Sequence, residues 1–110
     1  MAERTALEVV KFLEHSLTQS GLLIDKIVIF GSQATGMADV SSDIDVVIVS
    51  GDFAGKDIFE RAELTKDAEL ESIRTFLVPL DILTLTPEEF DDETSLVSEY
   101  TKRGQVVYAA

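Results

Sequence analysis

The chain has 110 residues, with 21 Asp or Glu against 9 Lys or Arg, so its formal net charge is -12. Nucleic-acid affinity rests on Lys and Arg that displace counterions, and this charge therefore disfavours a protein that binds bare nucleic acid. The charge suits cations, a basic protein partner or simple solubility. The length is that of a single domain, which we expect residues 1–110 to form.

Cysteine is absent, which excludes disulfides, thiolate catalysis and thiolate zinc sites. The opening Met-Ala-Glu-Arg-Thr lacks the apolar core of a signal peptide. No apolar run approaches the ~18 residues that a membrane span needs. We therefore expect a cytoplasmic protein.

The first half of the chain predicts one helix and two strands. Residues 4–19 repeat apolar side chains at helical intervals, and Gly21 ends that helix. Residues 26–30 are short, β-branched and apolar, which indicates a buried strand. Residues 32–36 could form a helical turn. Residues 43–50 predict a second strand, and because it is apolar on both faces beyond its first end, we expect it to be central in the sheet.

The second half predicts a helical region, a third strand and a further helix start. Residues 57–76 carry apolar side chains at mostly helical intervals, as one helix or two short ones. Residues 80–85 predict a strand, which Pro79 restricts to a strand start or a sheet edge because proline cannot donate to the ladder. Thr86, followed by a proline and two glutamates, marks the start of another helix.

The C-terminal part completes the predicted order of elements. Residues 94–103 predict a last helix that Gly104 ends, and residues 105–108 predict a short edge strand. Apart from this edge strand, helices thus lie between the three main strands and on either side of them. We expect an α/β (α+β) domain whose sheet has three or four strands flanked by helices.

Three aspartates interrupt the predicted strands. Asp43 and Asp45 lie two residues apart and so point to the same face of the second strand. Asp81 lies within the third strand. A carboxylate in apolar surroundings is costly unless it is paired, hydrogen-bonded or bound to a cation, and neither strand contains Arg or Lys. If the two strands are neighbours, the three carboxylates converge on one point.

Converging carboxylates without histidine or cysteine favour a hard cation, Mg²⁺ or Mn²⁺, over zinc. Two such ions about 3.5–4 Å apart can hold the attacking and leaving oxygens of an in-line phosphoryl or nucleotidyl transfer. Gly31 and Ser32 follow the first strand, where free backbone N–H groups at a helix start attract phosphate. The sequence therefore predicts a site for a nucleoside triphosphate.

A purely structural interpretation of the same residues is also open. Ser42 and Asp43 could form a turn and strand cap, Asp45 could accept hydrogen bonds from a loop, and Asp81 could be solvated at a strand end. An Asp-X-Asp pattern alone is common. The Gly-Ser pair upstream and the later strand aspartate together favour the metal site.

Three motifs together resemble the minimal nucleotidyltransferase family of the DNA polymerase beta-like nucleotidyltransferase superfamily. They are Gly31-Ser32, Ser42-Asp43-Ile44-Asp45 and Pro79-Leu80-Asp81. The predicted element order matches that family over nearly the whole chain. The resemblance implies the nucleotidyltransferase fold, a small mixed sheet flanked by helices.

The same resemblance implies roles for the motif residues. Gly31, Ser32 and Ser42 would bind the triphosphate donor, for which we favour ATP. Asp43 and Asp45 would bind two Mg²⁺ ions. Asp81 would complete the catalytic metal site and help to align or deprotonate the acceptor hydroxyl, so that the three aspartates are the expected catalytic and metal-binding residues.

The resemblance also implies a partner. Family members of this size are often paired with a HEPN-domain protein in prokaryotic toxin–antitoxin systems, and some transfer AMP to a tyrosine of the toxin. We therefore expect transfer of AMP from ATP to a hydroxyl of a partner protein, with pyrophosphate leaving. Family members often carry arginines just after the Gly-Ser pair, where this chain has Gln33 and Thr35. Neutralisation of the triphosphate then falls to the metal ions and to Lys56.

Two other functions remain as hypotheses. The missing arginines favour a catalytically weak or inactive antitoxin, a binding module that occludes a partner with its acidic surface. The third hypothesis is an acidic metal-binding fold without nucleotide chemistry. Its stability would depend on cations but not on ATP.

Overall fold

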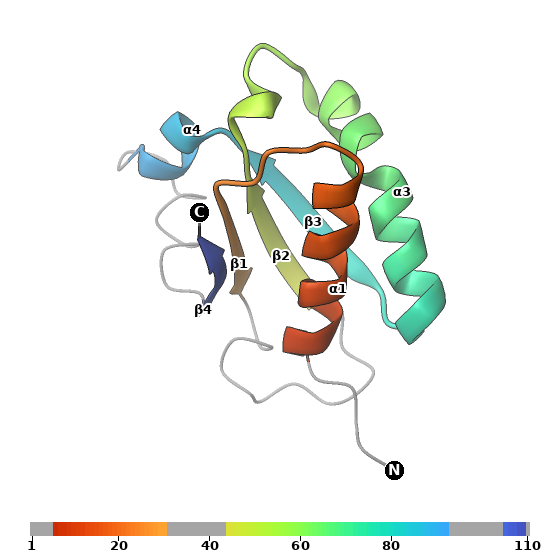
Figure 1. Ribbon diagram of the computed structural model, residues 1–110. Helices are drawn as coiled ribbons and strands as arrows, with labels where there is room; N and C mark the ends of the chain where they lie inside the picture. Colours follow the sequence, from red (N-terminus) through yellow and green to blue (C-terminus); the bar gives the residue numbers. More distant parts are fainter. Residues whose placement is uncertain (1–5, 31–43, 93–104, 110) are drawn as a thin grey trace.

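The computed structural model describes residues 6–30, 44–92 and 105–109 (Figure 1). Its elements are α1 (Ala6–Gln19), β1 (Lys26–Phe30), β2 (Ile44–Val49), the 3-10 helix η1 (Gly51–Phe53), α3 (Ile58–Phe76), β3 (Leu80–Leu85), α4 (Pro87–Asp91) and β4 (Gln105–Ala109). In this part of the chain, no helix is long and apolar enough to cross a membrane.

The predicted elements that fall within these ranges are confirmed to within two residues. The region predicted as one helix or two is the single helix α3, and the edge strand predicted at the C-terminus is β4. The helical turn predicted at 32–36 and the helix predicted at 94–103 lie outside the described residues.

The sheet has four strands in the order β3-β2-β1-β4 and is mixed. β1 pairs antiparallel with both β2 and β4, whereas β2 pairs parallel with β3. Parallel neighbours need a crossover connection, which α3 supplies between β2 and β3. β3, the strand that follows Pro79, lies at one edge of the sheet, as expected.

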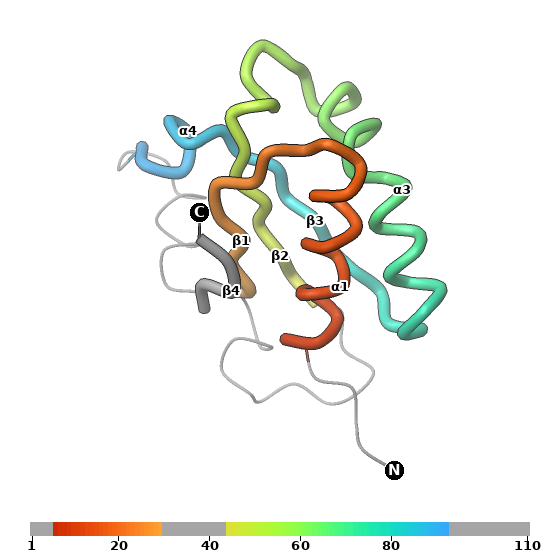
Figure 2. Tube along the Cα trace, in the orientation of Figure 1, coloured from red at the N-terminus to blue at the C-terminus, as the bar shows by residue number. Residues whose placement is uncertain are grey.

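The main core lies between the sheet and the pair of long helices. α1 and α3 lie side by side across one face of the sheet, as Figure 2 shows, and the rings of Phe12 and Phe76 meet edge to face with 5.4 Å between their centroids. Alternate strand residues reach this core, because strand side chains point to the two faces in turn. Its buried members include Val10, Leu13, Leu17, Ile27, Ile29, Ile44, Val46, Ile48 and Phe53.

A smaller core lies on the opposite face. Val47 and Val49 of β2 pack there with Val28 of β1 and with Phe90 of α4. β2 is therefore buried on both faces, and its predicted central position is confirmed. Phe90 packs in the same cluster as Val49, which ends β2. Asp45, the remaining β2 residue of the same parity, lies near the N-terminal end of this face.

Side-chain caps explain where the later helices begin. α3 starts at a capping box, in which the Asp57 carboxylate accepts from the Glu60 amide and Glu60 accepts from the Asp57 amide. α4 starts at an equivalent box formed by Thr86 and Glu89, with Pro87 in the first turn. The helix start predicted at Thr86 is confirmed.

Candidate functional site

Asp45 and Asp81 face each other across the parallel pair of strands. The register pairs Ile44 with Leu80 and Asp45 with Asp81, and the amide of Ile44 donates to the Pro79 carbonyl at 3.0 Å. Both aspartates are therefore the second residues of their strands. By strand alternation their side chains lie on the face of the smaller core, at strands separated by about 4.8 Å.

The two carboxylates differ in their surroundings. Asp45 is half-buried in the central strand β2, whereas Asp81 is exposed on the edge strand β3. α1 and α3 cover the opposite face, and α4 packs at the other end of this one through Phe90. The pair therefore lies on a face that the two long helices leave uncovered, at the end where β2 and β3 begin.

One carboxylate of α3, Glu69, is close enough to Asp81 to respond to its charge. Burial, followed by the nearby charge of Asp81, raises the pKa of Glu69 on α3 above its usual range. The sequence patterns did not indicate Glu69, because its half-buried position on α3 depends on how that helix packs against the sheet.

The described residues supply only part of the predicted cation site. Among residues 6–30, 44–92 and 105–109, no group of three or more Asp, Glu, His or Cys is arranged to hold a metal ion. Asp43, the third predicted ligand, lies outside the described residues, as do Gly31, Ser32 and Ser42. Their roles stay predictions.

The described residues on either side of residues 31–43 lie at the aspartate end of the sheet. Phe30, the last residue of β1, pairs with Asp45 in the antiparallel ladder. Ile44 begins β2 directly before Asp45. The chain therefore leaves β1 and enters β2 at the end of the sheet that carries Asp45 and Asp81.

Lys56 lies at the other end of the sheet, and its expected role in neutralising a triphosphate at the aspartates is wrong. It follows η1, which begins after β2 has ended. The strand alone separates Asp45 from Val49 by about 13 Å. Lys56 instead lines a hollow of about 440 Å³ between the end of α1 and α3, together with Asp52, Leu64 and Asp67.

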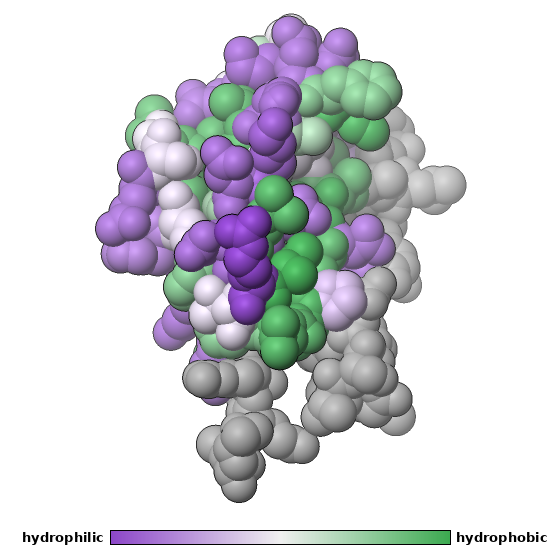
Figure 3. All heavy atoms as spheres, turned by 90° about the vertical axis from the view of Figure 1, so that its right-hand side faces the viewer, coloured by the Kyte–Doolittle hydropathy of each residue, from purple (hydrophilic) through white to green (hydrophobic). Residues whose placement is uncertain are grey.

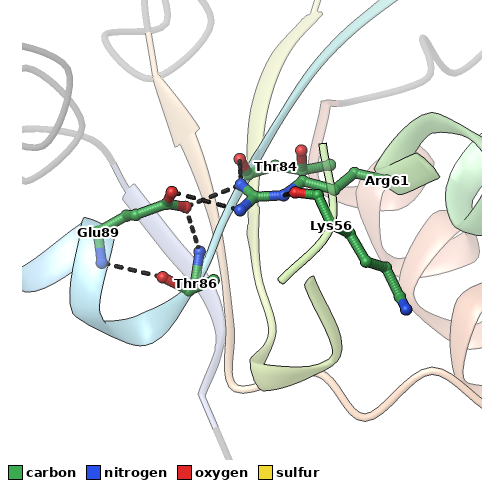
Figure 4. Close-up of polar contacts among 5 residues, drawn as sticks. All are labelled: Lys56, Arg61, Thr84, Thr86 and Glu89. Carbon is green, nitrogen blue, oxygen red and sulfur yellow. Dashed lines mark hydrogen bonds and ion pairs between the residues drawn. The ribbon is translucent and has the colours of Figure 1, made fainter. Parts of the chain in front are cut away.

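Arg61, near Lys56 in the sequence, also makes its hydrogen bonds away from the aspartates. Figure 4 shows its guanidinium between three elements: Nε donates to the Lys56 carbonyl at 2.9 Å, and Nη1 donates to the Thr84 carbonyl at 3.2 Å. Both terminal nitrogens donate to Glu89, at 2.8 and 3.3 Å. These bonds, above all, lower the pKa of Glu89. The arginine joins α3 to β3 and α4 and is a structural clamp.

The fold is an α/β domain with a mixed sheet and two helices on one face. Its candidate site is formed by aspartates of neighbouring strands on the other face. The family model of the nucleotidyltransferase domain matches residues 7–107, and the chain belongs to that family. Comparison with curated proteins finds no match.

Solved structures show the same fold. A candidate nucleotidyltransferase from Sulfolobus solfataricus is 26% identical with a TM-score of 0.62, over 77% of this chain and 70% of that one. A toxin–antitoxin structure with AMP-PNP is 16% identical with a TM-score of 0.61, over 89% and 72% of the two chains. The BolA domain of SufE1 from Arabidopsis thaliana is 22% identical with a TM-score of 0.51, over 74% and 93%. The last two likenesses concern the fold alone. The predicted nucleotidyltransferase fold is confirmed.

Proposed function

We propose that the protein is a Mg²⁺-dependent nucleotidyltransferase that transfers AMP from ATP to a hydroxyl of a partner protein. Membership of the nucleotidyltransferase family supports the class of reaction. The observation that carries the proposal is the parallel register that pairs Asp45 with Asp81. Two aspartates on one face and at one end of neighbouring strands repel each other, and a cation bound between them would remove that repulsion.

The donor groups fit a hard divalent cation. Asp45 and Asp81 offer carboxylate oxygens only, and Asp43 adds a third carboxylate two residues before Asp45. Oxygen ligands of this kind suit Mg²⁺ or Mn²⁺. In the proposal these three residues hold two ions, which when bound neutralise charge on the phosphates and on the attacking and leaving oxygens.

The chain's own residues then have separate tasks. Gly31, Ser32 and Ser42 bind the triphosphate, and the position of Phe30 and Ile44 at the aspartate end supports this assignment. Asp81, the more exposed carboxylate, accepts the proton of the acceptor hydroxyl. The acceptor oxygen bonds to the α-phosphorus, the bond between that phosphorus and the bridging oxygen breaks, and pyrophosphate leaves.

The partner in this proposal is a protein, for which we favour a HEPN-domain toxin. A structure with the same fold belongs to a toxin–antitoxin complex with AMP-PNP, which supports both a nucleotide and a partner protein. The net charge of -12 favours a partner with a basic surface. In that setting the protein is the antitoxin.

Transfer from labelled ATP to the partner tests the assignment. We expect the Asp43→Asn, Asp45→Asn double variant to lose transfer, and Asp81→Asn to lose about 10²- to 10⁴-fold as a general base does. Asp67→Asn, which makes the same charge change on the other face of the sheet, should transfer normally. Circular dichroism checks that each variant folds. AMP transfer by the folded double variant would show that these aspartates are not the catalytic metal ligands.

A second candidate is an antitoxin that acts by occlusion without catalysis. The observation that favours it is the position of Lys56, which lies at the far end of β2 and so does not replace the arginines that family members often carry where this chain has Gln33 and Thr35. Calorimetry of ATP with Mg²⁺ separates the two functions. No binding at millimolar nucleotide, with or without the partner, together with full neutralisation by the Asp43→Asn, Asp45→Asn variant, would establish occlusion.

A further inference from the structure

The outward side of α3 carries large apolar residues that the fold does not use. Phe59 is 79% exposed, Leu70 is 50% exposed and Leu77, at the C-cap, is 83% exposed. These residues are eleven and seven positions apart, close to whole numbers of helical turns, so they follow one side of the helix. The buried side of α3 is formed instead by Thr65, Ala68 and Ser72. We call Phe59, Leu70 and Leu77 the α3 stripe.

Leu77 stands out within the α3 stripe because its backbone conformation is also unfavourable for leucine. Its φ is 58°, in the left-handed region where helix C-caps usually have glycine. A Cβ in this region costs roughly 1–2 kcal/mol. A bulky apolar side chain that is held there and exposed to water contributes nothing evident to the isolated fold.

Charges of both signs flank the α3 stripe. Glu63 and Arg74 lie on one side of it, and Lys66 lies on the other, bonded to Glu63 at 2.9 Å. Figure 3, which views the molecule from the α3 side, shows apolar and hydrophilic side chains interleaved on this face. The whole chain has a net charge of -12, but the borders of the stripe carry charges of both signs.

We propose that the α3 stripe is a dimer interface that binds the same stripe of a second copy, with the two α3 helices antiparallel about a twofold axis. Copies with a net charge of -12 repel, so they can associate best where acidic residues of one copy meet basic residues of the other. A twofold axis near residues 68 and 69 places Glu63 opposite Arg74 of the second copy, and the symmetric contact follows automatically. The same register brings Phe59 close to Leu77 of the second copy and the two Leu70 side chains close to the axis.

This interface is compatible with the candidate site and does not depend on it. α3 covers one face of the sheet, whereas Asp45 and Asp81 lie on the other by strand alternation. A dimer through α3 therefore leaves both acidic sites open to a nucleotide or to another protein. A chain that does not transfer AMP could still form this dimer, and a monomeric chain could still transfer AMP.

Sedimentation velocity over a range of concentrations tests for the dimer. We expect the full chain to show a monomer–dimer equilibrium, and the Leu70→Asn, Leu77→Asn variant to raise the dissociation constant more than about a hundredfold because it removes both leucines of each copy from the interface. Circular dichroism checks its fold. A wild-type chain that stays monomeric up to about 1 mM overturns the proposal. A different protein would then be the occupant to test.

Charge reversal tests the antiparallel register. The Glu63→Arg variant would set two arginine side chains against each other across the interface, and the Arg74→Glu variant would set two glutamates, so each variant alone should weaken the dimer about tenfold. An equal mixture should form heterodimers of wild-type strength, because one variant then offers only positive charge and the other only negative charge at these contacts. Glu71→Arg, an equal charge change on the same helix away from the stripe, is the matched control. A mixture no stronger than either variant overturns the register.

Discussion

Leu77 shows how a single residue can cost the isolated fold stability. Its left-handed φ of 58° and its 83% exposure mean that the side chain neither packs nor suits its backbone. We predict that Leu77→Gly raises the free energy of unfolding of the monomer by about 1 kcal/mol, since glycine adopts this conformation without the steric cost. Urea unfolding at low protein concentration measures the change.

Leu77→Ala is the matched control for this prediction. Alanine removes the exposed side chain but keeps the Cβ, so it should give much less stabilisation than glycine. Equal gains for alanine and glycine would show that the exposed side chain, and not the backbone, is the source of the cost.

The candidate site was predictable residue by residue only in part. The spacing of Asp43 and Asp45 and the position of Asp81 within an apolar strand were visible in the sequence, because strand alternation is local. Glu69 was missed, since its relation to Asp81 depends on where α3 crosses the edge of the sheet. The role proposed for Lys56 failed for the same kind of reason, because distance along the chain does not report which end of a strand a loop occupies.

At the scale of elements, Arg61 and Glu89 hold α3, β3 and α4 together. The pKa of Glu89 is lowered mainly by its hydrogen bond from Arg61, so this contact stabilises the fold while Glu89 is ionised. The contribution is present above the pKa that Glu89 has in the unfolded chain and is lost as the pH falls through its lower folded value. Acid should therefore weaken the attachment of α4.

Replacement of Glu89 by glutamine tests this pH dependence. We predict that Glu89→Gln lowers the free energy of unfolding at neutral pH by less than about 1 kcal/mol, because 45% of the Glu89 side chain is exposed. The gap from wild type should close in acid, where the wild-type carboxyl is itself protonated. Thermal unfolding at several pH values measures it, with Glu88→Gln as the control. A gap that stays constant with pH would contradict the clamp.

Helix starts were the elements most accurately predicted. Thr86, Pro87 and the following glutamates specify a capping box through contacts within four residues, and the structure contains it. The number of helices between β2 and β3 was left open by the sequence. A single α3 forms because Thr65, Ala68 and Ser72 allow that one helix to pack against the sheet and α1 along its length.

At the scale of the whole molecule, the acidic charge makes stability sensitive to cations. We predict that Mg²⁺ stabilises the protein more than NaCl of equal ionic strength, because specific binding adds to the screening of like charges. At about ten times the dissociation constant the added stabilisation is about 1.4 kcal/mol. Thermal unfolding in the two salts measures it.

The Asp45→Asn variant separates specific binding from screening. It should keep the stabilisation that NaCl gives and lose the excess that Mg²⁺ gives to the wild type. An excess of equal size in the variant and in the wild type would place the cation away from the candidate site.

The sequence by itself determined the strands, the helices and the chemical character of the acidic site, because alternation, helical periodicity and capping are encoded within a few residues. The tertiary structure alone decided that β2 and β3 run parallel with Asp45 beside Asp81, that Lys56 lies at the opposite end, and that the α3 stripe faces solvent. Strand order and register depend on contacts between residues far apart in the chain, which no local pattern specifies.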